Sequence, residues 1–255
     1  MKSYLWTELI KTKGTTMRKI IVIIPLICMI MAGGFCALGG ADIIKMADIT
    51  TLNHWGLIWL PASIALMTGL FNKLETKSTG YKTIYGLPIS TAKVWIAKNI
   101  ILALLLLIAS IVLWVFICVF DIAFLGSELS INTLLSCLIA IMMSWAAILW
   151  QIPVYLWLAR RINYFLLIIV NCGLSILIAP IYAIQTNWWA IPWAWVLRFQ
   201  APILGLHPNG IPLEAGSDLL RYAGFPTAMV ISIILLVTVT IVSTWSFSLR
   251  KDCKI

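Results

Sequence analysis

The sequence predicts an all-α protein that crosses a membrane several times. Hydrophobic residues make up 62% of the chain and charged residues only 11%, and the mean hydropathy is +1.02. Several uncharged runs exceed about 20 residues, the length that a helix needs to cross roughly 30 Å of hydrocarbon. These runs lack the alternating polarity of barrel strands, and helices satisfy their own backbone hydrogen bonds in lipid. An ordinary soluble domain is therefore not expected.

Six apolar runs qualify as membrane spans, and we assign them to a single transmembrane domain covering residues 1–255. The spans are expected near residues 20–40, 55–72, 96–120, 131–157, 163–183 and 225–249. A cleaved signal peptide is not expected, because the first apolar run begins at about Ile20 behind a polar arm and is long enough to span.

The distribution of basic residues predicts the orientation. With six spans both termini lie on one side, and that side carries 15 of the 18 Lys and Arg residues, whereas the other side carries six of the nine Asp and Glu residues. The positive-inside bias therefore places both termini in the cytoplasm. It also accounts for the net charge of +9 without nucleic acid as a partner, since the basic residues flank spans.

Before the first span, residues 1–18 form a predicted amphipathic arm lying on the inner leaflet. Its apolar and polar side chains take opposite helical faces: Leu5, Trp6, Leu9 and Ile10 against Thr7, Glu8 and Lys11. Two roles remain open for this arm. It is either a membrane anchor that orients the first span or a coupling element against a partner subunit.

The connection between the second and third spans, Phe71 to Lys93, is compact, basic and rich in turn residues. Gly80, Gly86 and Pro88 punctuate it. We expect Tyr81 to Leu87 to form one or two helical turns lying across the membrane plane.

Ser90 or Thr91 is expected to cap the third span, because a hydroxyl at a helix start accepts a backbone hydrogen bond. A short helix held between two spans is suited to pass a push from a cytoplasmic motor into the bundle. The alternative is an ordinary basic inner loop.

The longest outer connection, residues 184–224, is rich in tryptophan. Because tryptophan prefers the headgroup layer, we expect this segment to lie in or dip into the outer interface. Its tryptophans form either an aromatic belt or a gate over an exit path for an amphipathic substrate: Trp188, Trp189, Trp193 and Trp195.

Polar side chains within spans four and five are expected to turn toward other helices. Most such groups hydrogen-bond between helices, and the alternative is that they line a cavity. The candidates for a substrate path here are Trp145, Gln151 and Asn171. No Asp, Glu, Lys or Arg is expected in the middle of a span, which argues against a carrier driven by protons or ions.

The sequence offers no catalytic or metal-binding constellation. It lacks the Gly-x-x-x-x-Gly-Lys-Ser/Thr phosphate loop, the His-Glu-x-x-His pattern and a credible Ser/His/Asp set. Its six cysteines and two histidines form no Cys-x-x-Cys pair or Cys/His cluster. If the protein transports actively, its energy must come from another subunit.

Two stretches resemble a known family. The run Glu75…Gly80-Tyr81-Lys82…Leu87-Pro88-Ile89-Ser90…Lys93…Lys98, preceded by Glu8-Leu-Ile-Lys11-Thr-Lys13, resembles the permease subunits of ABC-2 type exporters. Within that group it is most similar to the permeases of lantibiotic immunity transporters. The similarity covers nearly the whole chain: an amphipathic arm, six spans, a coupling helix between helices 2 and 3, and a long outer loop before helix 6.

The resemblance implies a transport subunit rather than an enzyme. ATP and Mg would be bound by a dimer of separate ATP-binding cassette ATPases, and this chain would bind no cofactor. A second permease, often a different chain, would pair with it. The residues implied to contact the ATPase are Glu75, Gly80, Tyr81, Tyr85, Gly86, Pro88 and Ser90.

The implied substrate is a cationic, amphipathic lantibiotic-type peptide, expelled from the plasma membrane of a Gram-positive bacterium to give immunity or resistance. Two alternatives stay open. One is an ABC-2 exporter of another amphipathic cargo, such as a drug, lipid or glycan. The other is a non-transport membrane scaffold or sensor-associated subunit.

Overall fold

The structure, a computed structural model, describes residues 1–78, 81–126 and 130–252. Within these ranges the chain is helical and contains no strand. The α-helices in chain order are α1 (Lys2–Lys11), α2 (Thr16–Leu38), α3 (Ala41–Ile44), α4 (Ala47–His54), α5 (Leu60–Ser78), α6 (Lys82–Gly86), α7 (Thr91–Phe124), α8 (Ile131–Ile148), α9 (Gln151–Leu158), α10 (Tyr164–Tyr182), α11 (Trp195–Leu204) and α12 (Phe225–Asp252).

Six helices in the described ranges are long and apolar enough to cross a membrane, so the predicted number of spans is confirmed. They are Thr16–Leu38, Ala47–Lys77, Thr91–Phe124, Ile131–Ile148, Tyr164–Tyr182 and Phe225–Leu249. The protein is therefore an all-α, multi-pass membrane protein.

Three spans differ most from their predicted bounds. The third is longer at both ends, since α7 covers Thr91–Phe124 instead of residues 96–120. The second is longer, because α4 continues through a π-helical stretch, Trp55–Trp59, into α5 without a break. The fourth is shorter, because the helix is interrupted at Leu149 and Trp150 before α9 begins. Pro153 explains this interruption, since a proline ring clashes with the carbonyl of the residue four positions earlier, here Leu149.

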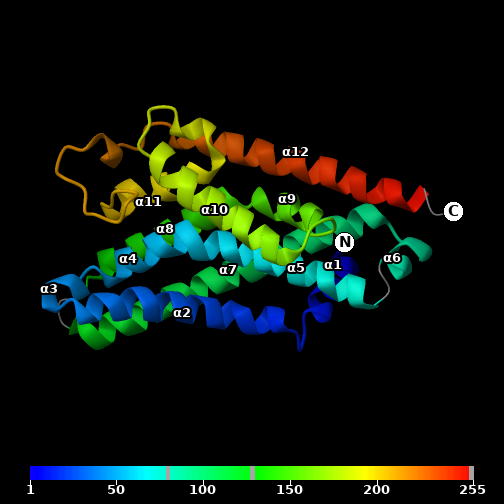
Figure 1. The fold of residues 1–255 in the computed structure, drawn as a ribbon, viewed down its shortest axis with the longest axis horizontal. Coiled ribbons are helices and arrows are strands. Elements are labelled where there is room, and N and C mark those ends of the chain that lie inside the picture. Colours follow the sequence, from blue (N-terminus) through cyan, green and yellow to red (C-terminus); the bar gives the residue numbers. More distant parts are fainter. Residues whose placement is uncertain (79–80, 127–129, 253–255) are drawn as a thin grey trace.

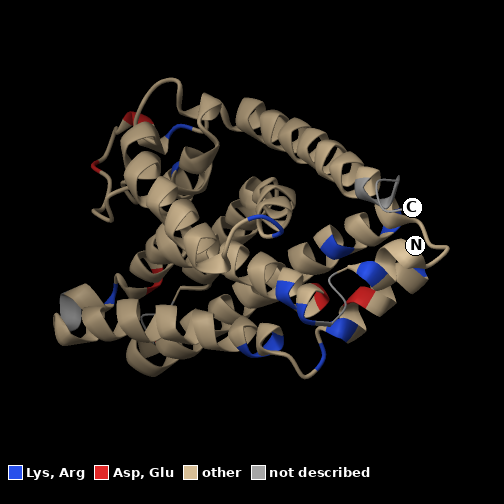
Figure 2. Ribbon diagram, turned by 45° about the vertical axis from the view of Figure 1, so that its right-hand side comes forward, with Lys and Arg blue, Asp and Glu red and all other residues tan. Residues whose placement is uncertain are grey.

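The helices run lengthwise, and α1, α6 and both chain ends lie at one end of the bundle, whereas α3 and α11 lie toward the other (Figure 1). We call these the terminal end and the far end. Lys and Arg residues concentrate at the terminal end (Figure 2). This segregation of charge is the pattern that the sequence predicted for the two sides of a membrane.

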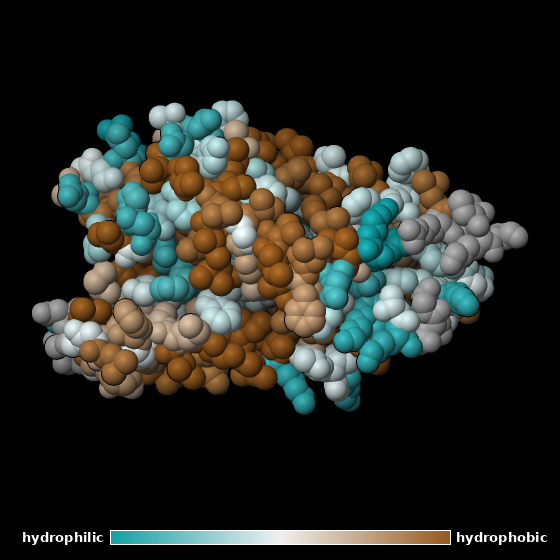
Figure 3. Space-filling view, in the orientation of Figure 1, coloured by the Kyte–Doolittle hydropathy of each residue, from teal (hydrophilic) through white to brown (hydrophobic). Residues whose placement is uncertain are grey.

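The long helix α7 contacts α1, α2, α8 and α12 and thereby forms the centre of the bundle. Trp95, Leu102 and Leu113 along α7 are fully or almost fully buried. By contrast, α10 and α12 expose large apolar side chains, such as Leu177 at 70% and Ile241 at 63%. Hydrophobic residues cover the middle of the visible face, as expected for contact with lipid (Figure 3).

The connection before α12 is not only a loop, as the sequence indicated, because part of it folds inward as α11. This helix packs against α8, and its residues Trp195 to Ala201 are buried. Pro192 begins the short 3₁₀ turn that leads into it, and Gly205 ends it in the left-handed conformation with φ of 64°. Proline before a helix and glycine after it are common boundary residues. Pro192 and Gly205 in the sequence therefore already mark the two ends of this helix.

Candidate functional site

The short helix α6 lies between α5 and α7 at the terminal end, where helical turns were predicted from Tyr81 to Leu87. Tyr81 precedes it in the left-handed conformation, with φ of 69°. At the start of α7, the hydroxyl of Ser90 accepts a hydrogen bond from the backbone N–H of Lys93 at 3.4 Å. Ser90, and not Thr91, is thus the cap. The segment before α6 differs from the prediction, because residues 71–78 continue α5 instead of forming a loop.

The segment containing α6 has an inner and an outer face. Tyr81 and Ile84 are buried against the bundle, whereas the outer face is exposed and consists of Lys82, Thr83, Gly86, Leu87 and Pro88. A side chain added at Gly86 would meet no atom within 4 Å. The outer face is therefore open for contact with another molecule.

Arg160, in the turn after α9, joins α6 to the rest of the bundle. Its guanidinium carbon lies 4.6 Å from the ring centre of Phe247, 5.3 Å from that of Tyr81 and 5.6 Å from that of Trp95. Arg160 also donates a hydrogen bond to the hydroxyl of Tyr85 at 3.0 Å. Cation–π contacts of this kind are stronger when they are shielded from water, so α6, α7 and α12 are held together at this point.

Tyr81 is also fixed from the α5 side. Its hydroxyl donates to Asn72 Oδ1 at 2.7 Å, and Asn72 Nδ2 donates to the carbonyl of Ala159 at 2.7 Å. Burial raises the pKa of Tyr81, so the hydroxyl remains neutral and able to donate. The Tyr81 ring consequently ties α6 to both α5 and the turn that carries Arg160.

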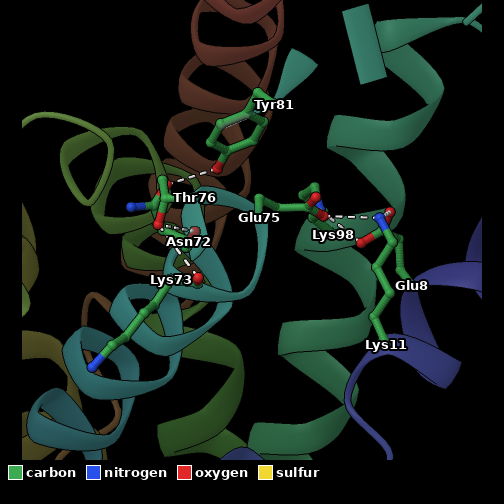
Figure 4. Close-up of polar contacts among 8 residues, drawn as sticks. All are labelled: Glu8, Lys11, Asn72, Lys73, Glu75, Thr76, Tyr81 and Lys98. Atoms are coloured by element: carbon green, nitrogen blue, oxygen red, sulfur yellow. Dashed lines mark hydrogen bonds and ion pairs between the residues drawn. The ribbon is translucent and has the colours of Figure 1, made fainter. Parts of the chain in front are cut away.

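Next to α6 lies a cluster of four ionisable side chains, which we call the ion cluster: Glu8, Lys11, Glu75 and Lys98 (Figure 4). Three of them are buried, and the side chain of Lys11 is 31% exposed. Lys98 Nζ lies 2.7 Å from Glu8 Oε2 and is also ion-paired with Glu75. Lys11 Nζ lies 2.8 Å from both Glu8 Oε1 and Glu75 Oε1. The cluster therefore connects α1, α5 and α7.

The charges of the ion cluster balance. Lys98 is fully buried, and its ammonium also lies 4.7 Å from the ring centre of Phe71. Burial lowers the pKa of Lys11, but the carboxylates of Glu8 and Glu75 outweigh burial and raise it above its usual 10.5. A buried ion is costly unless it is paired and hydrogen-bonded, and here each charge faces opposite charges.

One expectation needs correction here. Glu8 was assigned to the polar face of the arm, but it is 2% exposed and turned into the bundle. In the spans that the structure describes, the buried ionisable residues lie near the helix ends and not in the middle: Asp48, Glu75, Lys98 and Asp121. The arm is therefore held against α7 by an ion pair as well as by apolar contacts.

The structure distributes the predicted ATPase-coupling residues between these two features. Gly86 and Pro88 lie on the outer face of α6, Tyr81 and Tyr85 face the Arg160 contacts, and Glu75 belongs to the ion cluster. Gly80 lies outside the described residues. The contact of these predicted coupling residues with an ATPase remains a prediction. Sequence reasoning missed Arg160, which contacts Tyr81 and Tyr85 from the turn after α9.

Three of the predicted substrate-path residues come together deep in the bundle. Asn171 Nδ2 donates to Gln151 Oε1 and to the carbonyl of Pro61, both at 2.9 Å. Trp193 Nε1 donates to Asn171 Oδ1 at 3.4 Å. In this conformation these groups join α5, α9 and α10 to the tryptophan-rich connection.

The remaining predicted residues are dispersed. Trp188 and Trp195 are buried, and Trp189 is 39% exposed. Trp188 packs edge-on against Phe199 at a centroid separation of 5.7 Å. Trp145 lies apart from them and donates to the carbonyl of Ala103 on α7 at 3.0 Å. Burial of two of the four loop tryptophans means that they pack within the protein, whether or not they also take part in a gate.

Gln200 of α11 makes contacts that the sequence did not reveal. Its Nε2 donates to Ser144 Oγ at 3.0 Å and to the carbonyl of Leu52 at 3.1 Å. Gly56 permits this close approach, since a Cβ there would lie 2.7 Å from Val196 Cγ1. The inserted helix is thereby hydrogen-bonded to both α4 and α8.

Two carboxyl groups are buried at the far end of the bundle. Asp48 is 4% exposed and Asp121 is 1% exposed. Cys137 Sγ lies 3.6 Å from Asp48 Oδ2. Within the part of the chain that the structure describes, neither oxygen of Asp121 has a hydrogen-bond partner. The interior of the far end thus contains these two carboxyl groups as well as the buried Arg198 of α11.

Comparison with protein families identifies one match. Residues 4–188 match the family described as ABC-2 family transporter protein. This range contains most of α1, the ion cluster and α6, and it ends at the first tryptophan of the outer connection. No curated protein and no solved structure matches the chain significantly.

Proposed function

This chain belongs to the ABC-2 family of transporter proteins, and from this premise we propose that it exports cationic, amphipathic peptides of the lantibiotic type. It is a membrane-spanning permease subunit of an ABC transporter and carries no ATP-binding cassette of its own. An ABC ATPase is therefore its partner, and the transport cycle depends on how that ATPase reaches the bundle.

The observation that carries the proposal is that α6 has an exposed outer face, whereas its inner face is packed against the bundle. Lys82, Leu87 and Pro88 project from the terminal end, while Tyr81 and Ile84 on the opposite face are buried. We place the ATPase dimer against this outer face, with the terminal end and both termini in the cytoplasm. The concentration of basic residues at this end supports the orientation.

Two sets of contacts suit α6 to transmit movement. Arg160 links it to α7 and α12, and the ion cluster links the neighbouring ends of α5 and α7 to the arm α1. A displacement of α6 by the ATPase would therefore move several helix ends together instead of bending one loop. This arrangement favours the coupling role for the arm over that of a simple anchor.

Charge at the far end supports a cationic cargo. The exposed carboxylates Glu214 and Asp218 lie in the connection before α12. A negative potential on the receiving side attracts a positively charged peptide, and tryptophan side chains suit its apolar part. The peptide would leave the membrane toward the outside, with a second permease subunit completing the path and the cell gaining immunity or resistance.

The test is a resistance assay in a sensitive Gram-positive host that expresses this chain, its ATPase and the second permease. We expect growth in the presence of a cationic lantibiotic-type peptide to improve, and the improvement to disappear when the phosphate-loop lysine of the ATPase is replaced. A neutral amphipathic drug serves as the control cargo. Resistance to the drug but not to the peptide, or to neither, would contradict the proposal.

A further inference from the structure

A cavity of about 540 Å³ lies at the terminal end between the start of α2 and the last turns of α5. Its lining combines three kinds of side chain. Lys73 and Lys77 supply positive charge, Thr15 and Thr16 supply hydroxyl groups, and Met17 and Leu74 supply apolar surface. A ligand with a phosphate group and a hydrocarbon chain matches this lining, because the phosphate suits the basic and hydroxyl groups and the chain suits the apolar surface.

The two lysines face away from the ion cluster. Lys73 and Lys77 are four residues apart and share one side of α5, whereas Glu75 between them points toward Lys98 (Figure 4). Lys73 Nζ lies 5.4 Å from the ring centre of Tyr164. Neither lysine forms a salt bridge within residues 1–78, 81–126 and 130–252. Both positive charges therefore remain available to an anion.

The cavity lies where the membrane-spanning parts of α2 and α5 meet the polar residues of the terminal end. Met17 is buried three residues before the apolar run of α2 begins at Ile20, and Lys77 is exposed at the end of α5. The hydroxyl of Thr15 donates to the carbonyl of Thr12 at 2.7 Å and does not cap α2. Basic pockets between spanning helices at this depth are typical sites for anionic lipid headgroups.

We propose that this cavity binds the headgroup of an anionic phospholipid, with its phosphate between Lys73, Lys77 and the hydroxyl of Thr16. The start of the acyl chains lies against Met17 and Leu74. Because Gly14 and Thr15 belong to the turn that joins α1 to α2, the bound lipid also holds the arm in place. Lipid binding and the ion cluster thus act on opposite sides of α5.

The test measures the thermal unfolding of the purified full-length chain in a neutral detergent. We expect the midpoint to rise on addition of phosphatidylglycerol and to change little with phosphatidylcholine, since a ligand that binds only the folded state stabilises it. In the double variant Lys73→Gln/Lys77→Gln, phosphatidylglycerol should bind about 30-fold more weakly. The lipid-free midpoint of each variant checks that it is folded.

The matched control is Lys82→Gln/Lys93→Gln, which removes the same charge from exposed positions at the same end. It should keep the wild-type response to phosphatidylglycerol. An equal loss in both double variants would show general charge attraction and overturn the proposal, as would an equal response to phosphatidylcholine. A full response to inorganic phosphate alone would also overturn it in favour of a free-anion site.

Discussion

Lys98 Nζ lies 2.7 Å from Glu8 Oε2, although the two residues are 90 positions apart in the chain. Through this pair the arm α1 is held against α7, and through Glu75 the same lysine holds the end of α5. The two helices that flank α6 are therefore joined to the arm at one point. We propose that this connection supports α6 where it contacts the ATPase.

Removing the central cation should destabilise the bundle strongly. In Lys98→Met the carboxylates of Glu8 and Glu75 would stay buried with only Lys11 as a counterion, and breaking a buried pair in this way costs about 3–5 kcal/mol. Unfolding of the purified protein by detergent or heat measures this loss. The control Lys93→Met changes an exposed lysine of the same helix and should have little effect, so similar losses in both variants would contradict the role of the cluster.

Charge reversal at Glu75 should uncouple transport while the protein remains inserted. Glu75→Lys would gather three lysines around Glu8 and push α5 away from α7, so peptide resistance and stimulation of the ATPase should both fall. The double variant Glu75→Lys/Lys98→Glu restores a balanced set of charges and should recover part of both. Normal resistance and normal ATPase stimulation in the single variant would remove Glu75 from the coupling mechanism.

Hydropathy was sufficient to predict six spans, because each span is an apolar run that lipid itself selects. It could not reveal the pairing of Glu8 with Lys98, since local periodicity assigns a glutamate to the polar face and the lysine lies in another helix. Nor did it reveal α11, whose burial depends on contacts such as Gln200 with Ser144. The short helix α6 was predictable from glycine and proline, whereas the contacts of Arg160 depend on tertiary packing.

The contribution of Lys11 should be insensitive to pH across the neutral range. Its pKa is raised in the folded protein by Glu8 and Glu75, which outweigh the effect of burial. Stability from a raised lysine pKa is fully present below the unfolded value of 10.5 and is lost as pH rises through the folded value. The difference in unfolding midpoint between wild type and Lys11→Gln should thus be constant from about pH 7 to 9. A difference that shrinks within this window would contradict the assignment.

Substitution of a buried and of an exposed tryptophan in the outer connection should have different effects. Trp195 is fully buried, so Trp195→Leu should lower stability by roughly 2 kcal/mol. Trp189 is 39% exposed, and Trp189→Leu should fold normally. If Trp189 belongs to a gate for the peptide, this second variant lowers resistance at equal expression. Unchanged resistance would favour the aromatic belt.

The most direct test of the central claim, that α6 receives the ATPase, is site-specific crosslinking in cells. A photo-crosslinking amino acid is introduced in place of Leu87, which is 46% exposed on the outer face of α6, or in place of Ile211, which is 61% exposed toward the far end. We predict that illumination joins the chain at position 87, but not at 211, to a protein that mass spectrometry identifies as an ATPase with a phosphate loop. Capture of no such ATPase at position 87, or equal capture at both positions, would contradict the account.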